Sequence, residues 1–129
     1  MRKIFKRVGD RSGQLSLGDY PAMAYVRIGP NQTGAMVDTG SKRTVVDRWL
    51  AERAGAVALP RTGTLLIAGE KVRGRLHQVR IAALDGPCAA TVEALVPDEG
   101  QAFRKGVLLG MDFFQASGMV IDGLRGEAY

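Results

Sequence analysis

Short apolar segments separated by turns run through most of the chain. Residues 23–28 alternate loosely between apolar and polar side chains, and residues 29–34 carry a strong turn signal. An apolar run then leads directly to Asp38, and residues 44–46 resume an apolar, β-branched pattern. This pattern predicts a strand, a tight loop and a second strand, with an acidic side chain at the apex of the loop.

The middle of the chain has the pattern of paired strands. Residues 64–68 and 72–81 lie on either side of Gly69, and the second segment alternates apolar and polar residues. These two segments predict a long hairpin with a glycine near its tip. Residues 81–84 and 90–96, separated by a turn, predict a further strand pair.

Two segments have the signature of short helices. Residues 47–55 begin with an aspartate suited to capping, have apolar residues at helical spacing and end with a glycine. Residues 107–109 form an apolar strand that stops at Gly110, and Asp112 is suited to cap a short helix after it. With a last apolar segment at 119–121, the pattern predicts a mostly β fold with one or two short helices.

The length and composition indicate one domain with an extension at its N-terminus. The 129 residues are 46% hydrophobic and include 17 glycines, which fits a single core with many turns. Apolar residues flank the glycine-containing segment 9–13, and basic residues are frequent before it. We therefore expect residues 1–20 to form a basic arm or hairpin and residues 21–129 to form the folded domain.

The scarcity of cysteine and histidine excludes several kinds of chemistry. With one cysteine and one histidine, the sequence offers no internal disulfide, no cluster with zinc-ligand spacing and no Ser/His/Asp relay. We therefore expect neither a metal nor another cofactor. The sequence also has no apolar stretch of signal-peptide or membrane-span type, so we expect a soluble, cytoplasmic chain.

The net charge of +5 allows acidic partners without identifying one. Most basic residues are spread along the chain, as expected for a solvated surface, and the basic N-terminal arm is the exception. A small basic β barrel that binds nucleic acid is one hypothesis. The three Tyr, four Phe and one Trp do not interleave with the basic residues, which disfavours this hypothesis.

The loop segment Asp38-Thr39-Gly40-Ser41 is the strongest candidate for a functional site. An aspartate between two strands costs free energy unless it is hydrogen-bonded or used chemically. One interpretation is a plain β-turn, in which Asp38 bonds its own backbone and Gly40 supplies a positive φ. The other is a catalytic acid, and because the tripeptide Asp-Thr-Gly is short, its context must decide between them.

Two separated motifs resemble one protein family. Residues 35–41 resemble the active-site strand and loop of retropepsin-like aspartic proteases, and residues 108–114 (Leu-Leu-Gly-Met-Asp-Phe-Phe) are similar to that family's hydrophobic-hydrophobic-glycine strand and following helix. The predicted hairpin lies between them, where the family has its flap. The resemblance covers residues 24–124. It implies a retropepsin-like closed β barrel with a flap hairpin and the activity of an aspartic-type endopeptidase.

The resemblance also implies how the site works. Two aspartates activate a water that attacks the peptide bond, and two such carboxylates about 3 Å apart share one proton. The chain has one Asp-Thr-Gly, so we expect a homodimer that brings two Asp38 carboxylates together. By resemblance, Thr39 bonds across the dimer interface, Gly40 lets the substrate backbone approach, and the hydroxyl of Ser41 donates to the carboxylate.

An extended peptide or protein is the substrate that the resemblance implies. The hairpin tip would close over the peptide, and Leu108 would line the cleft. Lys42 and Arg43 stand where retroviral members carry acidic residues, so they either favour acidic side chains in the peptide or are solvated strand ends. The expected substrate-binding and flap residues are Lys42, Arg43, Ile67, Ala68, Gly69, Glu70 and Leu108.

An alternative from another class stays open at this point. A catalytically silent member of the same fold would bind an extended peptide or serve as a dimerisation module. The two readings differ in whether two Asp38 carboxylates meet across a two-fold axis and cleave a peptide.

Overall fold

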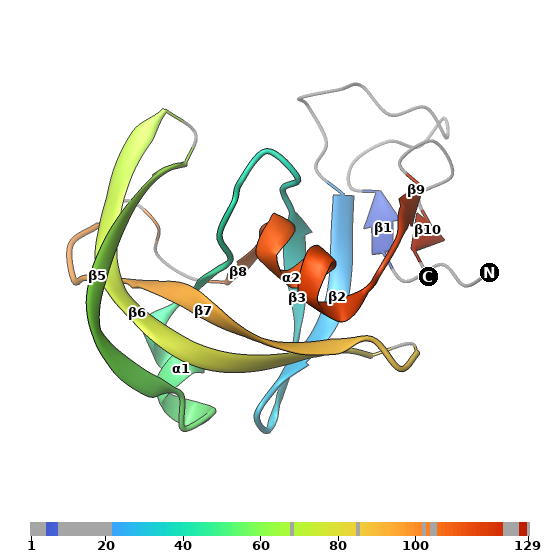
Figure 1. Cartoon of the computed structure of the whole chain (residues 1–129), viewed down its shortest axis with the longest axis horizontal. Coiled ribbons are helices and arrows are strands. Elements are labelled where there is room, and N and C mark those ends of the chain that lie inside the picture. The colour runs from blue at the N-terminus through green and yellow to red at the C-terminus, as the bar shows by residue number, and fades with distance from the viewer. Residues whose placement is uncertain are drawn as a thin grey trace.

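The segments with apolar alternation form strands, and the two segments with helical spacing form helices (Figure 1). The computed structural model describes residues 5–7, 22–67, 69–84, 86–101, 103, 106–122 and 127–128. Over these residues the fold is mostly β with two short helices, as predicted. The elements are β1 (Phe5–Arg7), β2 (Ala22–Ile28), β3 (Asn31–Val37), β4 (Val45–Val46), α1 (Arg48–Arg53), β5 (Val57–Ile67), β6 (Glu70–Ala83), β7 (Ala89–Pro97), β8 (Val107–Leu109), α2 (Met111–Ser117), β9 (Ile121–Asp122) and β10 (Glu127–Ala128).

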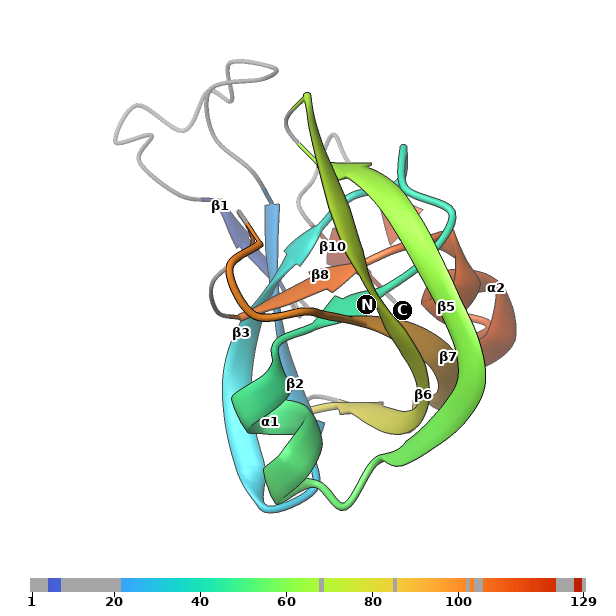
Figure 2. The ribbon, with the colours of Figure 1, turned by 90° about the vertical axis from the view of Figure 1, so that its left-hand side faces the viewer.

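Eight strands form one sheet in the order β1-β2-β3-β8-β4-β7-β6-β5. β2 also pairs with β6, with Val26 opposite Ala83, and this additional pairing joins six of the strands into a ring (Figure 2). β1 and β5 extend the sheet at its two edges. β9 and β10 pair only with each other among the described residues.

Two parallel pairings position the loop that contains Asp38. β3 lies parallel to β8, with Val37 opposite Leu109, and β4 lies parallel to β7. Because parallel strands end at the same side of a sheet, the residues that follow β3 and β8 emerge next to each other. The Asp38 loop therefore lies beside Gly110, although the two are 72 residues apart in the sequence.

The long hairpin predicted around Gly69 is confirmed. β5 and β6 pair antiparallel up to Ile67 opposite Glu70, and Gly69 has a φ of 80°, a left-handed conformation that favours glycine. The register between these strands shifts between Ala58 and Thr62, where β5 is irregular. Ala68, which the sequence analysis placed at the tip, lies outside the described residues.

The apolar side chains form two clusters on opposite faces of β6. Val72 and Leu76 point to one face, and Val79 and Ile81 point to the other. The main core fills the ring and includes both buried phenylalanines of α2. The second core lies under the hairpin. Its buried members are Val45, Val72, Leu76, Leu95 and Leu108, and the partly buried Leu59, Leu65, Ile67 and Phe103 pack against it.

The predicted capping is right for α1 and wrong for α2. The carboxylate of Asp47 accepts a hydrogen bond from the backbone N–H of Leu50 at 2.8 Å, as an N-cap does. The N-cap of α2 is Gly110, and Asp112 lies inside the first turn because its carboxylate is hydrogen-bonded to Thr44 instead. Among the described residues, no helix is long and apolar enough to cross a membrane.

Little of the predicted N-terminal arm belongs to the described residues. Residues 5–7 form β1, which pairs antiparallel with β2 with Phe5 opposite Ala24. The rest of the segment 1–20 lies outside the described residues, so its separation from a domain at 21–129 stays a prediction.

Candidate active site

The backbone around Asp38 forms a tight turn whose carboxylate takes part in it. The N–H of Asp38 donates to the carbonyl of Leu109 at 3.0 Å, and the N–H of Ser41 donates to the carbonyl of Asp38 at 3.1 Å. The N–H of Gly40 donates to Asp38 Oδ1 at 3.0 Å. Among the described residues, no hydrogen bond to Oδ2 is found. One carboxylate oxygen of Asp38, Oδ1, is therefore fixed by the turn.

Gly40 does not supply the positive φ that a plain turn would need from it, so that part of the turn interpretation is wrong. The other part of that interpretation is confirmed, because the carboxylate of Asp38 accepts a hydrogen bond from the N–H of Gly40. A Cβ atom added at Gly40 would lie 3.3 Å from Asp38 Oδ1. Glycine at this position keeps the space next to the carboxylate open, and both Thr39 and Gly40 are exposed.

A buried polar contact that the sequence pattern does not predict joins this turn to α2. Thr44 is fully buried, and its N–H and hydroxyl donate to the two oxygens of Asp112 at 3.0 and 2.7 Å. The same hydroxyl accepts from the N–H of Gly110 at 3.1 Å, and the N–H of Met111 donates to the carbonyl of Ser41 at 2.8 Å. We call the Thr44 and Asp112 contacts the Thr44–Asp112 clamp. It fixes the far end of the Asp38 turn.

Gly110 is required by the close approach of two backbone segments. A Cβ atom at this position would lie 2.6 Å from the carbonyl carbon of Arg43, which is backbone and cannot move aside cheaply.

We expect Gly110→Ala to lower the free energy of unfolding by about 2 kcal/mol through this overpacking. Chemical denaturation measures the loss. Gly34→Ala is the matched control, because a Cβ there meets side chains and no backbone: the flexible end of Met23 at 3.1 Å and the ring of Tyr25 at 3.9 Å. Equal effects of the two substitutions would contradict the proposed close contact.

The hydroxyl of Ser41 has a different partner from the one expected. It donates to the carbonyl of Arg43 at 2.8 Å. Because a serine hydroxyl has a single proton, it does not donate to the carboxylate of Asp38 in this structure. Ser41 supports the loop by holding its backbone.

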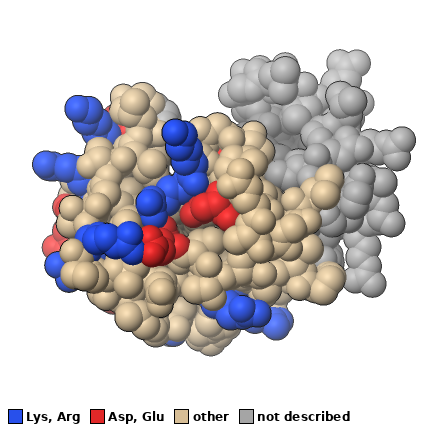
Figure 3. Space-filling model, viewed as in Figure 1, with Lys and Arg blue, Asp and Glu red and all other residues tan. Residues whose placement is uncertain are grey.

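Lys42 and Arg43 differ in their surroundings. Lys42 is exposed. Arg43 is half-buried, and its Nη1 donates to the backbone carbonyl of Glu93 at 2.6 Å and lies 4.0 Å from Glu93 Oε2. Most basic side chains on this face of the molecule lie over the half that carries β5 and β6, with acidic side chains between them (Figure 3). Arg43 and Arg61 both pair with Glu93, so these three side chains form a mixed charge cluster.

The hairpin covers the residue expected to line a cleft. Leu65 and Ile67 are half-buried against the second core, whereas Gly69 and Glu70 are exposed at the tip. Leu108 is only 2% exposed beneath them. Leu108 is covered because apolar side chains of the hairpin pack over it, and its role in lining a cleft stays a prediction.

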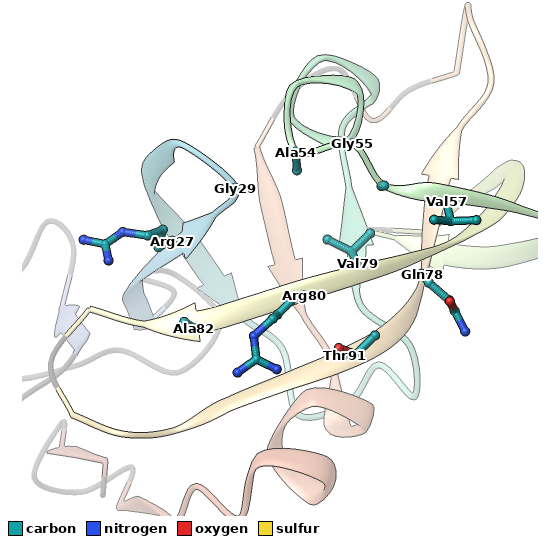
Figure 4. A pocket seen from close by; sticks show the side chains of 11 residues that line it. Arg27, Gly29, Ala54, Gly55, Val57, Gln78, Val79, Arg80, Ala82 and Thr91 are labelled. Atoms are coloured by element: carbon teal, nitrogen blue, oxygen red, sulfur yellow. The ribbon is translucent and has the colours of Figure 1, made fainter.

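A hollow beside α1 contains none of the predicted site residues. It has a volume of about 430 Å³ and lies between α1 and the outer face of β6 and β7 (Figure 4). Arg27 and Arg80 extend from it in different directions, so they do not converge on one ligand position. Within the described residues, no group of three or more His, Cys, Asp or Glu side chains could hold a metal ion.

A model of the family described as aspartyl protease matches residues 24–113, which is more than half of the chain. The matched segment contains the Asp38 turn, the hairpin and the Thr44–Asp112 clamp. No curated protein matches the chain.

Proposed function

The chain belongs to the aspartyl protease family, and from this we propose that it is a retropepsin-like aspartic endopeptidase that is active as a homodimer. The observation that carries the proposal is the Asp38 turn. One oxygen of its carboxylate is fixed by the N–H of Gly40, and the turn itself is held against residues 109–112. A carboxylate held this firmly beside an exposed glycine is suited to chemistry on an approaching backbone.

In this proposal, each copy of the chain contributes one Asp38 carboxylate. The ionised carboxylate takes a proton from water as the water oxygen attacks the peptide carbonyl carbon. The protonated carboxylate of the other copy donates its proton to the carbonyl oxygen. The first carboxylate then gives the proton that it took from water to the leaving nitrogen as the C–N bond breaks, and the second carboxylate takes back a proton from a hydroxyl of the tetrahedral intermediate. A single chain has one such turn, so the pair requires a second copy.

Other residues support this chemistry. Thr39, exposed next to Asp38, would bond across the two-fold axis. Residues 21–129 would form the protease domain, in which the ring of strands is a closed barrel and the β5–β6 hairpin is the flap. Residues 42, 43 and 67–70 would contact an extended peptide, and Leu108 would contact it only when the hairpin lifts from the second core. No observation favours a catalytically silent peptide-binding or dimerisation module.

Activity should depend on protein concentration because the site needs two copies. We expect a mass twice the 13.8 kDa of the chain at concentrations where casein, a disordered model substrate, is cleaved at about pH 5. The rate per chain should fall on dilution together with the dimer mass. A rate per chain that stays constant while the mass falls to that of a monomer would contradict the proposal.

A further inference from the structure

Glu93 lies between two arginines that come from different parts of the fold. Its carboxylate accepts a hydrogen bond from Arg61 of β5, and its backbone carbonyl and second carboxylate oxygen face Arg43. Glu93 itself belongs to β7. Three elements that are distant in sequence therefore meet at one side chain.

The Arg43 end of this contact is anchored to the Asp38 turn. The backbone of Arg43 accepts the Ser41 hydroxyl and packs against Gly110. The next residue, Thr44, is held by Asp112 on one side, and its carbonyl accepts a hydrogen bond from the N–H of Leu95 in β7 at 2.9 Å. A displacement of the Arg43 side chain would therefore also shift the backbone of the Asp38 turn.

The Arg61 end is anchored in the hairpin. Arg61 lies in the stretch of β5 between Ala58 and Thr62, where the register with β6 shifts. In the regular part of β6, Gln78 is the residue opposite Glu93, so the Arg61 side chain reaches across β6 to β7. An irregular strand has fewer ladder hydrogen bonds to hold it, and this ion pair replaces part of that restraint.

Exposure sets the strength of the contact. The side chains of Arg43, Glu93 and Arg61 are 35%, 39% and 55% exposed. Pairs this accessible are screened by salt and each shifts an equilibrium only a few-fold. The two ion pairs are therefore too weak to determine whether the chain folds. They are strong enough to favour one position of the β5–β6 hairpin over another.

We propose that Glu93 is a positioning residue that couples the β5–β6 hairpin to the Asp38 turn. With Glu93 present, the two arginines hold β5 down toward the turn that carries the catalytic carboxylate. Without it, two guanidinium groups face each other and β5 loses its restraint at the irregular stretch. The proposal rests on the peptidase function above, because it assigns the hairpin a role in holding substrate.

Hydrogen exchange tests the coupling independently of cleavage. We expect Glu93→Ala to raise the exchange rates of amides in β5 by about two- to five-fold, the range of an accessible ion pair. Glu99→Ala is the control, since Glu99 is an exposed glutamate outside this cluster. The charge swap Arg61→Glu with Glu93→Arg should restore protection better than either change alone. Unchanged exchange in Glu93→Ala would overturn the proposal even if the protein cleaves casein.

Steady-state kinetics separate positioning from simple destabilisation. With dye-labelled casein as substrate, Glu93→Ala should raise KM about three-fold and change kcat by less than about two-fold. At about 1 M salt, where the Debye length is about 3 Å, wild type should approach the variant's KM. A fall in kcat with unchanged KM would contradict the role. If wild type cleaves nothing, the peptidase function fails, and the exchange result still reports on the coupling.

Discussion

Replacement of Asp38 by asparagine should abolish casein cleavage, with kcat lowered by about three orders of magnitude or more. Asparagine retains an oxygen that can accept from the N–H of Gly40, so the turn is expected to keep its shape. It cannot take a proton from water or share one with a second carboxylate. Initial rates at about pH 5 measure the effect, and the dimer mass and thermal unfolding show whether the fold is intact.

Asp98→Asn is the matched control for this prediction. Asp98 is an exposed aspartate two residues before a glycine, in a turn closed by the N–H of Gln101 donating to its carbonyl. Asp98 follows β7 as Asp38 follows β3, and it has the same spacing to a glycine, but Glu99 stands where the Asp38 turn has Thr39. We expect its activity to equal that of wild type. Cleavage by Asp38→Asn at the rate of this control would contradict the role of Asp38.

Loss of the Thr44–Asp112 clamp should have the largest effect on stability. In Asp112→Ala, the buried N–H and hydroxyl of Thr44 lose their acceptor, whereas the N–H of Phe113 keeps the carbonyl of Gly110 as a partner. Buried donors left without a partner cost about 1–3 kcal/mol each when water cannot reach them. We expect the free energy of unfolding to fall by about 3 kcal/mol, measured by urea denaturation at a fixed protein concentration.

Two further variants make this result specific. Asp112→Asn keeps one acceptor oxygen for Thr44 and should lose less than Asp112→Ala. Gln115→Ala, on an exposed position of the same helix, should change stability by less than about 0.5 kcal/mol. If Asp112→Ala is as stable as Gln115→Ala, the clamp does not stabilise the turn.

The features predicted correctly from the sequence are those that depend on local residue patterns. The strand, loop and strand around Asp38, the hairpin around Gly69 and the capped helix after Asp47 each depend on residues close together in the chain. The family inferred from two short motifs is confirmed by the match over residues 24–113. Both motifs lie where parallel strands bring them together, which explains why the pair is informative.

The features that the sequence did not predict depend on contacts between distant residues. Asp112 was expected to cap α2, but Thr44, which is 68 positions away, offers it two buried donors. The Ser41 hydroxyl turns to the carbonyl of Arg43, a choice between neighbouring acceptors that residue type does not reveal. Leu108 is covered because the hairpin packs on the second core, and an alternating strand pattern fits a covered or an open leucine equally well.

The central claim is that two copies of Asp38 form one catalytic site, and mixing wild type with Asp38→Asn tests it most directly. After the two proteins are exchanged to equilibrium, with native mass measurement confirming mixed dimers, casein cleavage is measured per wild-type chain. At one wild-type chain to three variant chains, random pairing predicts a fall to about one quarter of the unmixed rate, since only dimers with two intact aspartates are active. A rate per wild-type chain that is unchanged by the variant would contradict the claim.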